Sequence, residues 1–439
     1  MPEIPRHDYV KLLVSHKGLL IVVAKSRILV LVERLGQGGA EKMGLMLAEM
    51  LQRAGKFEVY ICVTYRIDEF MFSANCVSIS SLEIDESKRF WGRCLNYFRK
   101  INRLRMLKKE LSIDLTISSL WPADWINVLT GKDRKIAIVQ INILNNIQNV
   151  QMVRFRKLVR YIYNRFDRVV VGSASLIDEL TGFFKIQNSQ LISIPNSIDV
   201  GLIDQNIQVA LPANVARLFK KYHVLVAANR LHETKNTKSL ISILKNLTDR
   251  SNVKLLIIGE GDEEKNLYEA IREEGLNYSR IDGLDFDETA DVYLLGFQMN
   301  IHNLIHQSKI FLFPSRAEGA PLALLEALCC STPVLASDCP NGGVFEVMQG
   351  SGAYGRDQVR TVSEQTKAGF LMPIPDPSTP SSIESWSRQI SYLLHSDKNE
   401  TQAIGSGGRT IATAYDRESV KLKWLETIDL VLQNNKNSL

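Results

Sequence analysis

The chain has 439 residues, of which 45% are apolar and 23% are charged, and its formal net charge is +5. This composition is ordinary for a soluble globular protein and excludes a chain too polar to build a core, while the length predicts two or three domains. The mild basic excess is compatible with an anionic surface or an anionic substrate and requires neither.

Residues 1–25 precede the first strong strand signal and are interpreted as an extension. Their apolar run, residues 18–24, is far too short to cross a membrane, and no small-residue cleavage site follows it. The cysteines form no C-x-x-C pair and no zinc spacing with histidine, so we expect reduced core thiols, a cytosolic setting and no cysteine catalysis. They are Cys62, Cys76, Cys94, Cys329, Cys330 and Cys339.

Short apolar runs alternate with helical patterns through the first half of the chain. The run at residues 28–32 leads into a glycine-rich loop at residues 36–41, and a helical pattern follows at residues 43–51. This alternation predicts a parallel, doubly wound sheet. Further strands of the series are predicted at residues 57–63, 115–117, 136–139 and 168–171, with residues 191–196 closing the domain.

A second alternating series begins after a linker. We predict a first domain at residues 1–195, a linker at residues 196–217, a second domain at residues 218–413, and a final segment, 414–439, whose helix crosses back to the first domain. Residues 349–367 are rich in Gly, Ser and Gln and are predicted to form an exposed loop. The strands of this series are predicted at residues 224–228, 254–258, 310–313 and 334–336.

Two glutamates, eight positions apart, form the most informative pair. Glu318 lies in the turn after the strand at residues 310–313, and Glu326 lies inside the helix that follows. From Pro321 to Cys330 every residue except Glu326 is apolar, which is typical of a buried helix. A lone carboxylate there is costly unless a partner binds it, whereas the free N–H groups at the helix start favour an anion.

Other polar groups also follow predicted strands, where open α/β sheets bind their ligands. Gly38 and Gly39 follow the first strand, and Arg230 and Lys235 follow the first strand of the second series. Gly259 and Gly261 follow another strand, without the full dinucleotide fingerprint. Each feature alone is weak evidence, since tight turns and solvated basic pairs are common. Together, at successive strand ends, they favour a diphosphate ester as ligand.

The chain resembles the retaining glycosyltransferases of family 4, which have the two-domain GT-B architecture of two Rossmann-like domains facing a central cleft. The resemblance runs from about residue 27 to the C-terminus. The block from Phe313 through Glu318 to Leu328 is quite specific, whereas the glycine loops are less so. The matching stretches are residues 38–42, 229–235, 257–261, 313–321 and 326–328, extended by residues 333–338 and 368–373.

The resemblance assigns roles to these residues. It implies that Glu326 binds the ribose hydroxyls of a nucleotide-sugar donor and that Glu318 holds the donor sugar. It implies that Arg230 and Lys235 neutralise the leaving diphosphate. No metal or other cofactor is implied, because basic side chains and helix dipoles supply the positive charge. Further implied donor contacts come from Gly38, Gly39, Gly259, Gly261 and the backbone N–H groups near Leu322 and Ala323.

The chain departs from the family at two places. Many relatives carry a histidine at the end of a first-domain strand, near the transferred sugar, but no histidine lies between His16 and His223. Gln140 or Asn142 stands in the expected place and could bind a sugar or acceptor hydroxyl, although neither can shuttle a proton as imidazole does. The second departure is Ser331-Thr332, which stands where glycine is common.

Two basic stretches belong to the first domain, which the resemblance makes the acceptor side. Residues 88–109 hold nine basic and no acidic side chains, together with an apolar stripe at helical spacing, and residues 154–168 are also basic. One interpretation is a helix packed by its stripe on the sheet, with a solvated basic face. The other is docking on an anionic membrane surface. No RNA or DNA motif is present, so nucleic acid is not an expected partner.

The resemblance therefore predicts a metal-independent, retaining hexosyltransferase that moves a sugar from UDP or GDP to a glycan or polyprenyl-linked acceptor. The expected pathway is envelope polysaccharide or glycolipid synthesis, such as lipopolysaccharide or capsule. The expected location is cytoplasmic and peripheral on the inner face of the cytoplasmic membrane. Two alternatives stay open, a nucleotide-sugar 2-epimerase or phosphorylase on the same fold and a non-catalytic, membrane-associated sugar-nucleotide binder.

Overall fold

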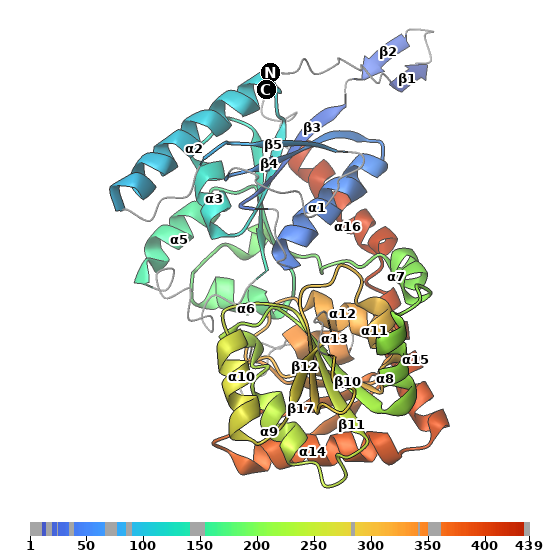
Figure 1. The fold of residues 1–439 in the computed structure, drawn as a ribbon. Coiled ribbons are helices and arrows are strands. Elements are labelled where there is room, and N and C mark those ends of the chain that lie inside the picture. Colours follow the sequence, from blue (N-terminus) through green and yellow to red (C-terminus); the bar gives the residue numbers. More distant parts are fainter. Residues whose placement is uncertain are drawn as a thin grey trace.

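A computed structural model describes residues 11–14, 20–23, 25–34, 39–65, 77–84, 90–140, 154–281, 286–340, 343–349 and 361–433. The chain forms two lobes, each built around one sheet with helices on both faces (Figure 1). An antiparallel pair, β1 (Lys11–Val14) and β2 (Leu20–Val23), forms a separate small sheet that stands away from the N-terminal lobe in Figure 1. None of the helices within the described ranges is long and apolar enough to cross a membrane.

The N-terminal sheet has the strand order β5-β4-β3-β6-β7-β8-β9, and all of its described pairs are parallel. Its strands are β3 (Ser26–Val32), β4 (Phe57–Val63), β5 (Ser78–Ser81), β6 (Leu115–Ser119), β7 (Arg134–Val139), β8 (Arg168–Val171) and β9 (Leu191–Ser193). The helices around it are α1 (Gly39–Arg53), α2 (Phe90–Glu110), α3 (Trp121–Val128), α5 (Arg156–Tyr163) and α6 (Ser175–Gly182).

Alternate residues of β3 serve the two faces of this sheet, because successive side chains of a strand point to opposite sides. Ile28, Val30 and Val32 pack with α1, whereas Leu29 and Leu31 pack with α2 and α3. A parallel strand covered on both faces is apolar throughout, and this is why its sequence signal is a continuous run.

The C-terminal sheet has the order β12-β13-β11-β10-β14-β15-β17-β16, and only its edge strand β16 is antiparallel among the described pairs. Its strands are β10 (His223–Ala228), β11 (Val253–Ile258), β12 (Tyr278–Arg280), β13 (Val292–Leu295), β14 (Ile310–Phe313), β15 (Val334–Ser337), β16 (Glu364–Thr366) and β17 (Gly369–Met372). The two large sheets, each with helices on both faces, confirm the predicted doubly wound α/β class.

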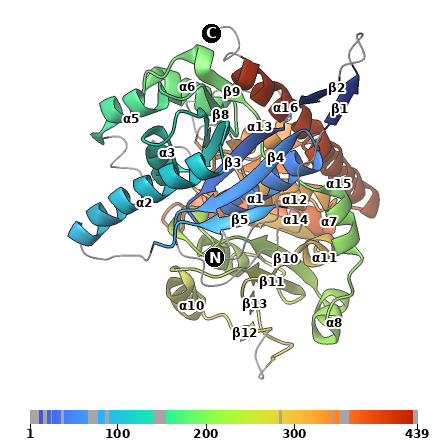
Figure 2. The ribbon, with the colours of Figure 1, turned by 90° about the horizontal axis from the view of Figure 1, so that it is seen from above.

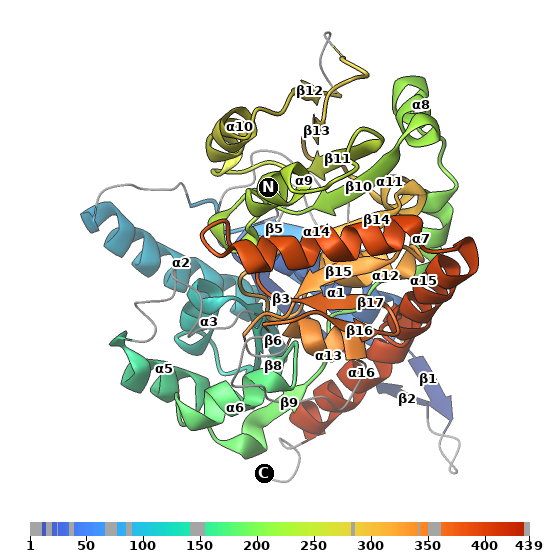
Figure 3. The same cartoon turned by 90° about the horizontal axis from the view of Figure 1, so that it is seen from below.

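Helices cover both faces of the C-terminal sheet, and α14 runs across the face seen from below in Figure 3. They are α7 (Val200–Ile207), α8 (Ala213–Lys221), α9 (Ser239–Lys245), α10 (Glu264–Glu273), α11 (His302–Gln307), α12 (Leu322–Cys329), α13 (Gly343–Gln349), α14 (Pro380–His395) and α15 (Lys398–Thr413). These helices pack through apolar faces on the strands beneath them. The last helix, α16 (Arg417–Gln433), packs instead on the N-terminal lobe.

In each sheet the strand order reverses beside one central strand. β3 lies between β4 and β6, and β10 lies between β11 and β14. Where the connections after two neighbouring strands run to opposite faces of the sheet, a crevice forms at the carboxyl ends of those strands. Folds of this kind bind their ligands in that crevice. The carboxyl ends of β3, β10 and β14 therefore lie at the two reversal points.

The connections between the lobes are themselves structured. The segment predicted as a linker contains α7 and the start of α8, and Ile203 and Val215 are buried in the core of the C-terminal lobe. At the other end, α16 lies alongside α1 in the view from above (Figure 2), and Trp424 and Ile428 are buried with strands β3 and β4. The chain therefore passes between the lobes twice, once before α7 and once before α16. These two passages lie side by side, because Ile198 of the first pairs with Asp416 of the second.

Two local features differ from the simple sequence interpretation. The segment predicted as an exposed loop includes β16, whose edge position lets polar residues pair on one side only. Helix α12 begins at Leu322, with Pro321 as its N-cap rather than its first residue. Residues 350–360 of the predicted loop lie outside the described ranges.

We expect Ser331→Gly to stabilise the protein. Ser331 follows the end of α12 with φ of 59°, a left-handed conformation that glycine adopts without strain. Removing the strain should stabilise the folded state by more than the added conformational entropy of glycine stabilises the unfolded chain. The free energy of unfolding should therefore rise by about 0.5 to 1 kcal/mol. Thermal unfolding of the purified protein should show a higher Tm. Ser331→Ala is the control and should give no increase; an equal increase in both variants would contradict the backbone explanation.

Candidate active site

Glu318 lies in the turn after β14 and is part of a compact hydrogen-bonded group. Its Oε1 accepts hydrogen bonds from Lys235 Nζ at 2.6 Å and from Ser315 Oγ at 2.7 Å. The Lys235 side chain is 28% exposed, whereas that of Glu318 is 8% exposed. A backbone hydrogen bond from Arg316 N–H to the Thr234 carbonyl holds the two loops together. The structure thus brings two predicted site residues into direct contact from different strand ends.

Lys235 closes a short 3-10 turn, η3 (Glu233–Lys235), that follows β10. Asn236 comes next, with φ of 54°, and its side-chain amide donates to the carbonyls of Pro314 and Pro375. These bonds anchor the turn to the loop after β14, so the Lys235 ammonium is positioned by the backbone beneath it. Arg230, in contrast, is exposed and makes no ion pair within the described residues.

Glu326 is the buried carboxylate of α12. Lys42 of α1, in the other lobe, donates from Nζ to Glu326 Oε1 at 2.5 Å. His302 of α11 places Nε2 3.8 Å from the same oxygen, which is beyond hydrogen-bond length. Burial raises the pKa of Glu326, but the positive charge of Lys42 and the interaction with the nearby His302 ring outweigh burial and lower the pKa to about 2. Glu326 is therefore ionised, with its main counterion supplied from across the cleft.

The start of α12 presents free amide groups. No side chain caps this helix, and the first N–H groups of any helix have no partner within it. Leu322 and Ala323 are the first two residues, directly after the turn that carries Glu318. A helix start of this kind attracts an anion through its N–H groups and its dipole.

The glycines at 259 and 261 serve close backbone packing. A Cβ atom at Gly259 would lie 2.0 Å from the carbonyl oxygen of Asn229, and one at Gly261 would lie 2.1 Å from that of Leu231. Leu231 N–H also donates to the Glu260 carbonyl. The loop after β11 therefore lies directly on the loop that carries Arg230, and side chains larger than hydrogen would push the two apart.

The remaining predicted positions are in the N-terminal lobe. Gly39 is the first residue of α1, at the carboxyl end of β3. Gln140 is buried at the end of β7, with its side-chain nitrogen 3.4 Å from Asn196 Oδ1. Gly38 and Asn142 lie outside the described residues.

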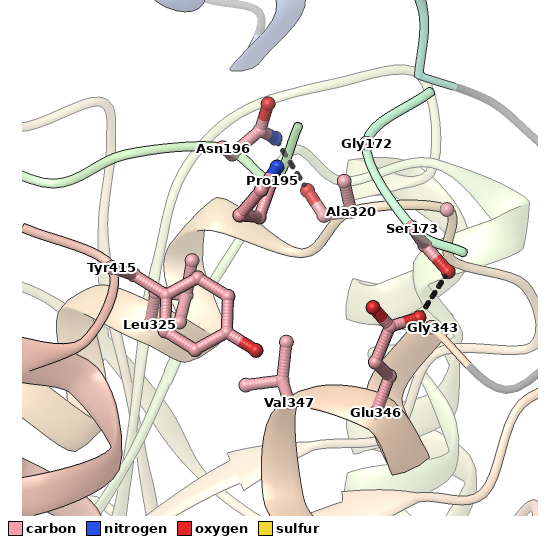
Figure 4. Close-up of a pocket in the computed structure, with 11 residues that line it drawn as sticks. Gly172, Ser173, Pro195, Asn196, Ala320, Leu325, Gly343, Glu346, Val347 and Tyr415 are labelled. Atoms are coloured by element: carbon pink, nitrogen blue, oxygen red, sulfur yellow. Dashed lines mark hydrogen bonds between the residues drawn. The ribbon is translucent and has the colours of Figure 1, made fainter. Parts of the chain in front are cut away.

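Polar contacts join the two lobes around a small pocket (Figure 4). Glu346 of α13 accepts hydrogen bonds from Ser173 Oγ at 2.8 Å and from Ala174 N–H at 3.0 Å, at the start of α6. Asn196 donates to the carbonyl of Ala320 at 2.9 Å. The pocket lining comes from both lobes and consists of Gly172, Ser173, Pro195, Asn196, Gly319, Ala320, Leu325, Gly343, Glu346, Val347 and Tyr415.

Lys42, His302 and Glu346 are site residues to which the sequence-based predictions assign no role. A role for Lys42 could have been predicted, because a basic residue in the first turn of a helix is unfavourable beside the positive end of the helix dipole. Such a residue indicates a nearby anion. No such signal exists for His302 and Glu346, since their partners are distant in the chain. Taken together, the site combines an anchored ammonium, free helix amides and two carboxylates, which suits a ligand with both phosphate and hydroxyl groups.

Two family profiles match the chain, one for each lobe. Glycosyltransferase Family 4 matches residues 37–202, and Glycosyl transferases group 1 matches residues 213–353. The chain belongs to this family of glycosyltransferases. It is 28% identical over 203 residues to an uncharacterised glycosyltransferase of Methanocaldococcus jannaschii, a match that covers 45% of this chain and 47% of the relative, so it spans about half the length of each.

Two further comparisons cover more of the chain. N-acetylgalactosamine-N,N'-diacetylbacillosaminyl-diphospho-undecaprenol 4-alpha-N-acetylgalactosaminyltransferase of Campylobacter jejuni is 25% identical over 322 residues, covering 70% of this chain and 80% of the relative. The crystal structure of Anabaena HepE in complex with UDP has a TM-score of 0.68 and 17% identity, covering 92% of this chain and 99% of that one. This structural likeness confirms the predicted GT-B fold.

We expect Lys42→Met to destabilise the protein in a pH-dependent way. The low pKa of Glu326 means that its ion pair with Lys42 is fully present above about pH 4.5, the ordinary value, and is lost as the pH falls toward 2. Because the Lys42 side chain is 37% exposed, the cost at pH 7 is about 2 kcal/mol, between the values for buried and surface pairs. The measurement is the difference in Tm between Lys42→Met and the unaltered protein, followed by thermal unfolding from pH 7 to pH 3.

The control is Lys56→Met, which removes an exposed pair with Asp429 and should cost only a few tenths of a kcal/mol. A Tm difference for Lys42→Met that stays constant from pH 7 to pH 3 would contradict the assignment of Lys42 as the counterion of Glu326.

Proposed function

We propose that this glycosyltransferase is a retaining enzyme that transfers a sugar from a UDP-sugar to a lipid-linked glycan during synthesis of an envelope polysaccharide or glycolipid. The observation that carries the proposal is the contact between Lys235 and Glu318 beside the free amides of α12. This contact brings together a cation, a helix start and a carboxylate that can accept a hydrogen bond from a hydroxyl, although they come from two different loops. A sugar joined to a diphosphate requires such a combination.

Each group has a role in the proposed reaction. Lys235, Arg230 and the amides of Leu322 and Ala323 stabilise the diphosphate as negative charge develops on it. Glu318 accepts a hydrogen bond from a hydroxyl of the donor sugar, and Glu326 accepts from the ribose. Gly38, Gly39, Gly259 and Gly261 let backbone approach the donor, and Gln140 or Asn142 binds a sugar or acceptor hydroxyl. No metal is required under this proposal, because these groups supply the positive charge.

The chemistry is a front-face displacement. The acceptor hydroxyl oxygen forms a bond to the anomeric carbon on the side from which the diphosphate departs, while the bond from that carbon to the phosphate oxygen breaks. The hydroxyl proton passes to the departing phosphate oxygen. The anomeric configuration is thereby retained, and the protein contributes charge stabilisation and positioning rather than a base.

The choice of UDP and of a lipid-linked acceptor follows the comparisons. The Anabaena structure was solved with UDP, and the Campylobacter relative is named for a diphospho-undecaprenol acceptor and an N-acetylgalactosaminyl group. A UDP-N-acetylhexosamine is accordingly the first donor to test, with GDP-mannose as the alternative nucleotide.

We expect the full chain to release UDP from a UDP-N-acetylhexosamine only when a polyprenyl-diphosphate-linked saccharide is added, and to do so equally in EDTA. Lys235→Met and Glu318→Gln should each lower kcat about 100- to 1,000-fold, because each removes a group that stabilises the transition state. Product mass and released nucleotide provide the measurement.

Lys238→Met is the matched control, since Lys238 is an exposed lysine three residues further along the chain and has no assigned role. Full activity in Lys235→Met would refute the proposed role of Lys235. Epimerised donor in the absence of acceptor would instead identify the enzyme as an epimerase.

We propose in addition that the N-terminal lobe docks on an anionic membrane surface, which would bring a lipid-linked acceptor to the cleft. Only part of the predicted stripe of α2 packs on the sheet: Leu104 is buried, whereas Leu95 and Phe98 are exposed, Phe98 by 69%. Exposed arginine and lysine residues follow them on α2 and are present again on α5, which lies beyond α3 on the same side of the lobe in Figures 1 and 2. Lys100 and Lys108 are buried and do not belong to this surface.

We expect the protein to co-sediment with vesicles that contain phosphatidylglycerol and not with pure phosphatidylcholine vesicles. The double variant Phe98→Ser, Arg99→Glu should weaken this binding tenfold or more, because each charge near the surface contributes about 1 kcal/mol and the exposed ring adds apolar contact. Leu422→Ser on α16, where the leucine is 60% exposed, is the control and should bind as the unaltered protein does. Equal binding by both variants would refute this surface.

A further inference from the structure

Within the described residues, one buried polar atom next to Glu326 makes no hydrogen bond. His302 is 5% exposed and is the first residue of α11, the helix that leads to β14 and packs beside α12. Its Nε2 is fully buried and makes no hydrogen bond within the part of the chain that the structure describes. It faces Glu326, with Nε2 3.8 Å from Oε1.

The other nitrogen of the ring determines what Nε2 can do. Asn206 of α7 places its side-chain nitrogen 3.2 Å from His302 Nδ1. An amide nitrogen can only donate, so Nδ1 is the acceptor and Nε2 carries a proton. Asn206 is itself fixed, because its backbone carbonyl accepts a hydrogen bond from the Asn300 side chain. His302 therefore presents an N–H donor toward the carboxylate, and burying such a donor without an acceptor costs free energy.

The distance of 3.8 Å is too long for a direct hydrogen bond and short enough for one oxygen atom to contact both groups. A hydroxyl oxygen between them could accept from Nε2–H and donate its own hydrogen to Glu326. Glu326 Oε1 now accepts from the Lys42 ammonium, whose side chain is 37% exposed, so this contact lies at the edge of the cleft and can be exchanged for a ligand.

We propose that His302 is a binding residue for the ribose of the nucleotide donor, donating from Nε2 to the ribose hydroxyl that donates to Glu326. The inference rests on the proposed function, because it requires a nucleoside at Glu326. It makes the ribose site a pair of groups, an acceptor on α12 and a donor on α11, with Asn206 fixing the tautomer. Such a pair selects a hydroxyl over hydrogen at that position, because loss of the hydroxyl leaves both buried groups without a partner.

The test is calorimetric binding of UDP, 2′-deoxy-UDP and 3′-deoxy-UDP to the full chain, with GDP and its deoxy analogues used if UDP does not bind. The unaltered protein should prefer UDP about tenfold or more over at least one deoxy analogue. His302→Phe, which keeps the ring and removes both nitrogens, should weaken UDP binding about tenfold and abolish that preference. His302→Gln, whose amide can still donate, should restore part of both.

His306→Phe is the matched control, because His306 lies on the same helix and its Nδ1 contacts the Cys330 carbonyl, away from Glu326. It should bind UDP and the analogues as the unaltered protein does. If His302→Phe fails to fold, His302→Asn, whose amide is too short to reach the same place, should lose the preference in the same way.

The outcomes separate the two proposals. Binding of UDP by the unaltered protein, with the same affinity and the same ribose preference in His302→Phe, overturns the inference and leaves the proposed function standing. Failure of the unaltered protein to bind either UDP or GDP overturns the proposed function and the inference with it. Loss of the ribose preference in His302→Phe alone, with His306→Phe unchanged, supports both.

Discussion

The ionised carboxylate of Glu326 constrains the rest of the site. Because it is buried on an otherwise apolar helix, its charge requires a close counterion, and the residue that supplies one, Lys42, lies 284 positions away on the opposite lobe. The free-energy cost of burying this carboxylate therefore depends on the position of one lobe relative to the other. Any ligand that replaces the ammonium at Glu326 must also change a contact between the lobes.

Parallel sheets explain why so many separate segments meet there. In both lobes the chain leaves a central strand and its neighbour toward opposite faces, so β10 and β14 end at one edge of the C-terminal sheet and β3 ends at the corresponding edge of the N-terminal sheet. Backbone contacts then set the fine geometry: the glycines after β11 lie on the loop of Arg230, and Asn236 holds the turn of Lys235. The charged groups are thus placed by rigid backbone, which suits catalysis by electrostatic positioning.

Much of the site was predictable from local sequence because its elements are local. A strand, a glycine turn and an apolar helix with one glutamate predict Glu318 at a strand end and Glu326 inside a helix, and both are found there. The partners of these residues were not predictable in the same way. His302 meets Glu326 only because α11 and α12 pack together, and the exposure of Phe98 depends on how far α2 extends past the sheet that covers Leu104.

The sequence by itself determined the two doubly wound lobes and the strand ends that carry polar groups, because continuous apolar runs and helical periodicity are properties of neighbouring residues. Only the tertiary structure decided which charges pair across the cleft, which histidine nitrogen is left without a partner, and which part of the basic helix stays exposed. Those outcomes depend on distances between segments that are separated in the chain, and such distances are fixed by the packing of helices and lobes rather than by any pattern along the chain.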